Sequence, residues 1–388
     1  MSDNVIPIEG LPKKKKWYRR RALLLTLLVL AVVLLLGLYL LLSRADWDSF
    51  RRFFSYYSVA DEASYGKFTF DAGYANAYCA FDDGLAVAGS GGLTTYSPYG
   101  NEQAVAQLTM DTPAVKKGGG IVLAYDVGGS ALLAINDKNE VLLSLSTANT
   151  LFDADIGSNG SICYLTSDKA SRAILTVLNG RQEEIYKWYS NSQHLSHCAI
   201  SDNTRYVAAI GIGQKNGGFA SSALILDTGK EVPVCTVELG SQVIYSLRFL
   251  DNQTLCAVGE SSVLVFGVDG TLRGEYAYGE RYMEDFCESG SFTALRMNAN
   301  RAGDKYTLVT LDENGEKLAE YFVGKQILDM DAAGDYLAVL TAGSLTIFTR
   351  ELEVYRTADA VGTASTVLMR ADGTAILVST GTAELYIP

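Results

Sequence analysis

One strand-turn-strand unit recurs eight times along the chain of 388 residues. Its apolar second strands begin at Leu85, Ile121, Ile162, Tyr206, Leu255, Phe292, Tyr336 and Ala375. Successive starts lie 36 to 49 residues apart, which is close to the length of one four-stranded β-propeller blade. Turns such as Asp269-Gly270 and Asn314-Gly315 suit tight hairpins, since both residue types tolerate positive φ. The sequence therefore predicts an all-β, eight-bladed β-propeller, with seven blades as the alternative if one unit is irregular.

The two ends of the repeat region predict how the ring closes. The eighth unit ends at its third strand, AELYIP, whereas the strand GKFTFDA at 66–72 precedes the first unit and has no partner. If 66–72 supplies the fourth strand of the last blade, no sheet edge is left open at the closure. The propeller is therefore expected to span residues 66–388.

A single membrane-spanning helix is expected before the propeller. Residues 22–42 contain no charge and no proline, and a helix of 21 residues is about 31 Å long, which matches the hydrocarbon core of a bilayer. A cleaved signal peptide is the alternative, because Ser43-Arg44-Ala45 offers small residues at the required positions. The apolar stretch is longer than the usual signal core of about 7–15 residues, which favours an uncleaved anchor.

The flanking charges predict the orientation of this helix. The tail 1–21 carries seven basic residues, whereas only Arg44, Arg51 and Arg52 follow the helix within ten residues. The positive-inside rule then places the tail in the cytoplasm and the propeller outside the plasma membrane. Residues 43–65 form a connector with an aromatic stripe at helical spacing.

Charge also restricts the partners of the external part. The whole chain has a formal charge of −12, and the tail 1–21 contributes +5, so the remainder carries −17. An acidic domain of this kind is repelled by phosphate backbones, which argues against nucleic-acid binding.

The loops on one face of the propeller are the expected binding surface. The connector arrives on the face of the first-to-second strand turns, which should look toward the membrane. The opposite face carries the second-to-third loops, the longest of which are 213–220 and 298–305. Propellers commonly bind through such loops. The candidate binding residues there are Lys215, Asn216, Phe219, Arg281, Tyr282, Arg301 and Asp304.

Charged residues also recur at equivalent positions of the inner strands. Alignment of these strands places Asp155, Arg248, Asp285, Asp329, Asp331 and Arg370 on the side that faces the axis. They are expected to line a central channel. Two interpretations follow: a site for a cation or polar ligand, or mutual ion pairing and hydration, which the presence of both signs favours.

No metal site, cofactor site or catalytic motif is predicted. The two histidines, His194 and His197, stand beside Cys198 without further ligands at a recognisable spacing. The six cysteines contain no CxxC pair, so zinc-ribbon and thioredoxin-type chemistry are disfavoured. They fall in apolar strands, where they are either disulfide-bonded or buried free thiols.

The repeat units carry a family resemblance. The segments 334–355 (GDYLAVLTAGSLTIFTRELEVY) and 227–233 (DTGKEVP) resemble quinoprotein-like and WD40-like propeller repeats. The chain lacks the Gly-His and Trp-Asp pairs of WD40 repeats, and Trp188 is the only tryptophan of its propeller region, which argues against a quinone cofactor. With its basic-flanked anchor, the chain looks like uncharacterised single-span bacterial propeller proteins of the domain-of-unknown-function type.

Together these observations predict a function. We expect a membrane-anchored, extracytoplasmic propeller that binds or scaffolds an envelope protein or a cell-wall polymer without catalysis. The alternative is a glycan-active enzyme that uses channel carboxylates, which would need two such groups at a defined separation.

Overall fold

The structure is a computed structural model that describes residues 24, 25, 27–30, 32, 52, 56, 66–71, 73, 76–300, 306–359 and 361–388. The chain divides into two compact units, Met1–Ser58 and Val59–Pro388. In the first unit, residues 24, 25, 27–30 and 32 are helical. Most of the expected span 22–42 lies outside the described residues. Within the part that is described, no helix has both the length and the apolar character needed to cross a membrane.

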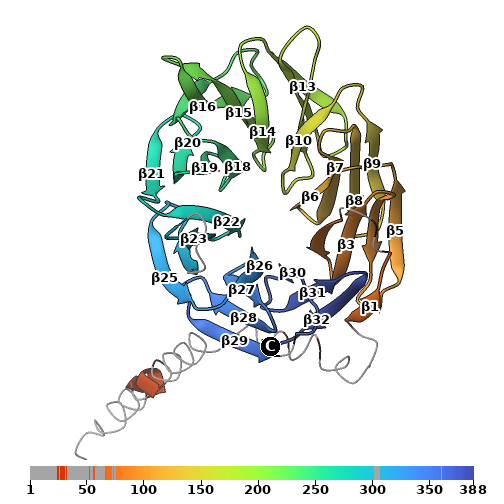
Figure 1. The fold of residues 1–388 in the computed structure, drawn as a ribbon, viewed down its shortest axis with the longest axis vertical. Coiled ribbons are helices and arrows are strands. Elements are labelled where there is room, and N and C mark those ends of the chain that lie inside the picture. The colour runs from red at the N-terminus through yellow and green to blue at the C-terminus, as the bar shows by residue number, and fades with distance from the viewer. Residues whose placement is uncertain are drawn as a thin grey trace, which may run out of the picture. The chain divides into compact units, whose positions relative to one another are not determined.

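The second unit is an eight-bladed β-propeller, which confirms the predicted fold (Figure 1). Each blade is a four-stranded antiparallel sheet, numbered here from the inner strand outward. Blade 1 contains β2 (Ala77–Phe81), β3 (Gly84–Gly89), β4 (Gly92–Tyr96) and β5 (Glu102–Gln107). Blade 2 contains β6 (Pro113–Gly118), β7 (Ile121–Asp126), β8 (Ala131–Asn136) and β9 (Val141–Ser146). Blade 3 contains β10 (Leu151–Ile156), β11 (Ile162–Thr166), β12 (Ala173–Leu178) and β13 (Glu184–Ser190). Blade 4 contains β14 (His194–Ile200), β15 (Tyr206–Lys215), β16 (Gly218–Asp227) and β17 (Cys235–Gly240).

The second half of the ring repeats this pattern. Blade 5 contains β18 (Ile244–Phe249), β19 (Thr254–Gly259), β20 (Ser262–Gly267) and β21 (Leu272–Ala277). Blade 6 contains β22 (Tyr282–Glu288), β23 (Thr293–Asn298), β24 (Tyr306–Leu311) and β25 (Lys317–Val323). Blade 7 contains β26 (Ile327–Ala333), β27 (Tyr336–Thr341), β28 (Ser344–Thr349) and β29 (Val354–Asp359). Blade 8 contains β30 (Thr366–Met369), β31 (Ala375–Ser379), β32 (Thr382–Tyr386) and, as its outer strand, β1 (Lys67–Thr69).

The ring closes where the two ends of the propeller meet. The strand β1 pairs antiparallel with β32 in the register Lys67↔Glu384 and Thr69↔Thr382. Because β1 comes from the start of the propeller and β30–β32 from its end, the last blade joins both ends of this unit. Strand pairing thus protects the outer side of β32, which would otherwise present unpaired backbone groups.

The core is divided among the seams between neighbouring blades. Each of the eight seams contains one cluster of buried apolar side chains, such as the cluster of Ala199, Ile225 and Leu255 between blades 4 and 5. The middle strands contact a neighbour on both faces, so β7, β12 and β27 are buried along their whole length. Outer strands such as β5 alternate between exposed and buried residues.

Candidate functional site

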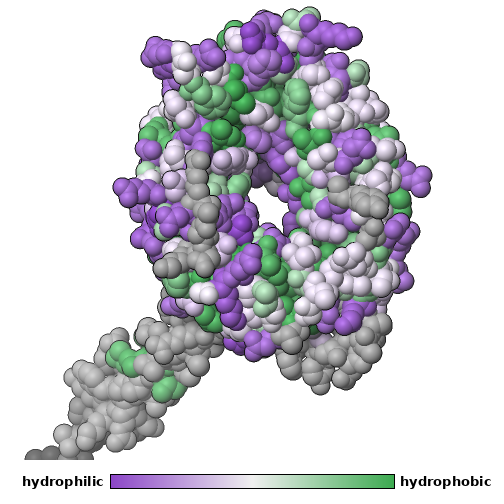
Figure 2. Space-filling view, in the orientation of Figure 1, coloured by the Kyte–Doolittle hydropathy of each residue, from purple (hydrophilic) through white to green (hydrophobic). Residues whose placement is uncertain are grey.

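The inner strands of six blades surround a polar cavity on the axis of the ring. Its volume is about 670 Å³, and the space-filling view shows an open hole through the ring (Figure 2). The strands that line it are β6, β10, β14, β18, β22 and β26. Its charged lining residues are Lys116, Lys117, Asp155, Asp202, Arg248, Asp251, Asp285, Glu288, Asp329 and Asp331. Acidic residues outnumber basic ones, so the cavity carries a net negative formal charge.

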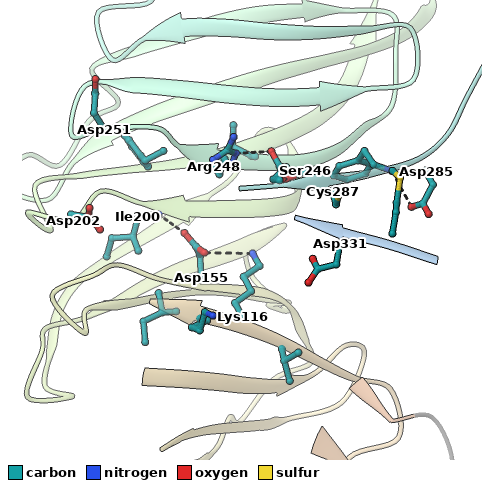
Figure 3. A pocket seen from close by; sticks show the side chains of 18 of the residues that line it. Lys116, Asp155, Ile200, Asp202, Ser246, Arg248, Asp251, Asp285, Cys287 and Asp331 are labelled. Atoms are coloured by element: carbon teal, nitrogen blue, oxygen red, sulfur yellow. Dashed lines mark hydrogen bonds and ion pairs between the residues drawn. The ribbon is translucent and has the colours of Figure 1, made fainter. Parts of the chain in front are cut away.

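Five of the six expected channel residues lie on this wall. Asp155, Arg248, Asp285, Asp329 and Asp331 all line the cavity, and Figure 3 labels four of them (Asp155, Arg248, Asp285 and Asp331). Arg370 departs from the expected placement. Its guanidinium reaches blade 1, where Nη2 lies 3.1 Å from the backbone oxygen of Asp82 and 3.1 Å from Oδ1 of Asp83. Arg370 follows the last residue of β30, so its long side chain reaches the first turn of the next blade.

A buried charge cluster joins blades 2, 3 and 4. The carboxylate of Asp153 is 4% exposed and accepts a hydrogen bond of 2.7 Å from the hydroxyl of Tyr125. Lys116 Nζ lies 3.3 Å from Asp153 Oδ1 and 3.8 Å from Asp155 Oδ1. His197 Nδ1 lies 3.7 Å from Asp153 Oδ2. Burial acts to raise the pKa of Asp153, but Lys116, His197 and Tyr125 outweigh it and hold that pKa well below its usual range.

Paired carboxylates attach two of the inner strands to the next blade. Asp153 and Asp155 on β10 accept the backbone N–H groups of Cys198 and Ile200 on β14, at 2.8 and 3.0 Å. The same arrangement recurs between blades 7 and 8. There Asp329 and Asp331 on β26 accept the N–H groups of Val367 and Met369, at 2.8 and 2.7 Å. Alternate residues of a strand point to one side, so an Asp-x-Asp sequence presents both carboxylates to the neighbouring strand.

Arg248 makes an equivalent connection between blades 5 and 6. Its Nε donates to Glu288 Oε1 at 2.7 Å and its Nη1 to the backbone oxygen of Ser289 at 2.7 Å. Ser246 also donates to Glu288, at 2.6 Å. The charged groups of the channel therefore join neighbouring blades, as the ion-pairing interpretation expects.

The remaining channel carboxylates are less well compensated. Burial raises the pKa of Asp155, Asp285 and Asp329 despite nearby cations and backbone donors. Burial also raises the pKa of Asp331 to about 6, and the charge of Asp329 adds to this effect, whereas backbone donors and Lys117 oppose it. Asp285, Asp329 and Asp331 belong to blades 6 and 7, so these two blades supply three of the carboxylates with a raised pKa.

Neither the histidines nor the cysteines form a metal centre in the part of the chain that the structure describes. No group of three or more His, Cys, Asp or Glu side chains there has a geometry that would hold a metal ion. All six cysteines lie in strands as free thiols, and Cys163, Cys198, Cys256 and Cys287 are buried. Burial raises the pKa of Cys256 to about 12 and that of Cys198 well above its usual range, which disfavours the reactive thiolate.

The expected loop 213–220 is instead a projecting β-hairpin. Strands β15 and β16 have ten residues each and pair as far as Lys215↔Gly218. Asn216 and Gly217 form the turn, both with positive φ, of 53° and 81°. The Asn-Gly pair is the sequence signal for such a hairpin and extends the strands where the glycine-rich composition suggested a loop. Lys215 pairs with Glu238 at 3.4 Å, and Phe219 is exposed near the tip.

Other candidate binding residues lie at the same end of neighbouring blades. Tyr282, the first residue of β22, is exposed, and Arg281 beside it binds Glu320 at 3.2 Å and the hydroxyl of Tyr276 at 2.6 Å. Tyr245, which was not among the predicted binding residues, is exposed at the start of β18. An aromatic residue directly after a link between two blades was the sequence signal that could have identified it as a candidate binding residue. Arg301 and Asp304 lie outside the described residues.

The ring and its polar axis define the protein as a β-propeller with an accessible central cavity. Residues 52–359 match the model of a family of unknown function, DUF5711, and the chain belongs to that family. No curated protein matches the chain. The crystal structure of the C-terminal WD40 domain of Sif2 is similar, with a TM-score of 0.59 and 11% identity over 83% of this chain and 97% of that one. At this identity the likeness shows the fold.

Proposed function

We propose that this propeller is a non-catalytic binding or scaffolding module that engages an envelope protein or a cell-wall polymer. The observation that carries the proposal is an array of exposed aromatic side chains at one end of three consecutive blades. Phe219, Tyr245 and Tyr282, here called the aromatic face, lie at or next to the start of β16, β18 and β22, and each is at least 40% exposed.

Strand direction places these three side chains on the same side of the ring. In an antiparallel blade the first and third strands run in the same direction, so their starts share one end. β18 and β22 are first strands, and β16 is a third strand. Exposed aromatic residues grouped in this way are typical of protein interfaces, where Tyr and Phe supply much of the contact energy. Lys215 and Arg281 supply a charged border.

The location is also part of the proposal. The uncharged stretch 22–42, the seven basic residues before it and the charge of −17 after it support a single anchor with the propeller outside the plasma membrane. The aromatic face is then at the end of the ring opposite the turns next to the connector, which leaves it accessible to an external partner.

Removal of the aromatic face tests the binding proposal. We expect the triple variant Phe219→Ser/Tyr245→Ser/Tyr282→Ser to recover partners at least about tenfold less well than the wild-type chain after in-cell crosslinking and affinity capture. Val141→Ser/Leu272→Ser, which changes exposed residues of the outer strands β9 and β21, is the matched control and should capture normally. Thermal melting checks that each variant folds. Normal capture by the folded triple variant would contradict the proposal.

The proposed membrane anchor and the external position of the propeller are tested separately. Full-length chain should remain in the membrane fraction after alkaline carbonate extraction, and protease added outside intact cells should reach the propeller but not a tag on residue 1. The variant Leu28→Asp/Val29→Asp/Leu30→Asp should release the chain from membranes, because each charge at the centre of a span costs about 2.5–3.5 kcal/mol. A protected propeller, or a tag cut from outside, would contradict the proposed orientation.

A further inference from the structure

A groove of about 420 Å³ lies along the outer part of the seam between blades 6 and 7. Its floor contains Val323, Val339 and Phe348, which are buried members of the apolar cluster of this seam. The groove therefore lies directly over the apolar core between these two blades.

The walls of this groove are apolar and unusually exposed. Tyr321 and Phe322 are adjacent on β25 and are 40% and 60% exposed. Val354 on β29, which is 55% exposed, lies opposite Phe348 in the strand register. The ring of Tyr321 packs 5.0 Å from that of Phe348. Exposed apolar groups around an apolar floor gain free energy when a partner covers them.

The other end of the groove is polar and has a positive charge. Lys325 Nζ lies 3.5 Å from the hydroxyl of Ser344, and Thr341 lies beside them on the wall. None of the lining residues is acidic, and within the described chain no carboxylate forms an ion pair with Lys325. In a domain with a large excess of acidic residues, this end of the groove is a local site for an anionic group.

We propose that the groove binds an extended segment of a partner protein in which an acidic side chain stands about four residues from a large apolar one. This inference rests on the proposed function as a binding module. It gives the propeller a second contact surface, separate from the aromatic face. The carboxylate pairs with Lys325, while the apolar side chain packs between Phe322, Phe348 and Val354.

The strand geometry sets the spacing of the two contacts. Ser344 and Phe348 lie on the same strand, β28, four residues apart, which corresponds to about 13 Å at 3.3 Å per residue. An extended peptide that runs along β28 has the same rise, so its acidic and apolar residues match the two ends at the same separation. A helix covers only about 6 Å in four residues and fits this spacing poorly.

Peptide selection tests the proposal on the full-length chain. A phage-displayed random dodecapeptide library is selected against the detergent-solubilised protein, and enriched peptides are synthesised with fluorescein for polarisation measurements. We expect enrichment of Asp or Glu four positions from Leu, Ile or Phe. Phe322→Ser and Lys325→Glu should each weaken binding at least about tenfold, and replacing the peptide's acid by Lys should restore binding to the Lys325→Glu variant. Lys317→Glu, on β25 but paired with Glu320, and Leu272→Ser are matched controls that should bind normally.

The alternative outcomes are distinct. Enriched peptides without an acidic residue, binding that the groove variants leave unchanged, or no enrichment would each overturn the proposal. Binding of chitohexaose or a peptidoglycan fragment that depends on Phe322 but not on Lys325 would assign the groove to a glycan instead. If the groove variants have no effect while the aromatic-face variant still loses its partners, this inference fails and the proposed function stands.

Discussion

Replacement of Asp153 by Asn should lower the free energy of unfolding by about 3 kcal/mol at pH 7, which urea titration followed by tryptophan fluorescence would measure. The carboxylate is almost fully buried and compensates Lys116 at 3.3 Å. Asn keeps an oxygen that can accept from Cys198 N–H, but it removes the negative charge. Lys116 is then left with only Asp155 at 3.8 Å. Because the Lys116 side chain is 31% exposed, we expect a loss of stability at the low end of the range for breaking a buried ion pair.

Asp155→Asn is the matched control for this prediction. It lies two residues away on the same strand and also accepts a backbone N–H of blade 4, from Ile200. Its pKa is raised rather than lowered, because burial disfavours its charge, so neutralising it should cost far less stability. Equal losses for the two variants would contradict the assigned role of Asp153. The double variant Lys116→Met/Asp153→Asn should lose less stability than the two single variants combined.

The sign of the pH dependence follows from the lowered pKa of Asp153. The stabilisation is present above the unfolded value of 3.8 and is lost as the pH falls through the lower folded value. The difference between wild type and Asp153→Asn should therefore be constant from pH 5 to 7 and shrink in acid. A difference that grows in acid would identify another group as the cause.

The repeat was predictable because its signals are local. All eight second strands begin within one residue of the expected positions, since each combines an apolar run with a turn immediately before it. The contacts of the channel carboxylates were not predictable in the same way. Asp153 and Asp329 accept from backbone N–H groups 45 and 38 residues further along the chain. Every residue except proline has a backbone N–H, so the residue type does not indicate which one donates.

The hairpin and the groove were also only partly predictable from the sequence. The hairpin tip at Asn216-Gly217 carries a sequence signal that the surrounding glycines obscured. For the groove, the adjacent Tyr321 and Phe322 on an outer strand point to opposite faces of that strand, so at least one of the two rings is expected to be exposed. The opposing residue Val354 belongs to the next blade, so its position depends on the packing of two repeats.

Replacement of Asp331 by Asn should stabilise the protein at pH 7.5 and leave its stability at pH 3 almost unchanged. Burial raises the pKa of this carboxyl from 3.8 to about 6, so the folded state resists its ionisation. Well below pH 3.8 the group is neutral in both states. As the pH rises from 3.8 to about 6, the wild-type protein loses stability because the unfolded chain ionises first, and above pH 6 the loss is constant. The shift corresponds to about 3 kcal/mol.

Asn suits this position because its oxygen can still accept from Met369 N–H, while its amide can donate toward Asp329. The measurement is the difference in unfolding free energy between variant and wild type from pH 3 to 7.5. Asp168→Asn is a control of opposite sign: hydrogen bonds from the backbone and hydroxyl of Ser171 lower the pKa of Asp168, so that variant should be destabilised near neutral pH. If Asp331→Asn were destabilised at pH 7.5, the ionised carboxylate would be holding blades 7 and 8 together. The acidic side of the channel would then be a stabilising element of the ring.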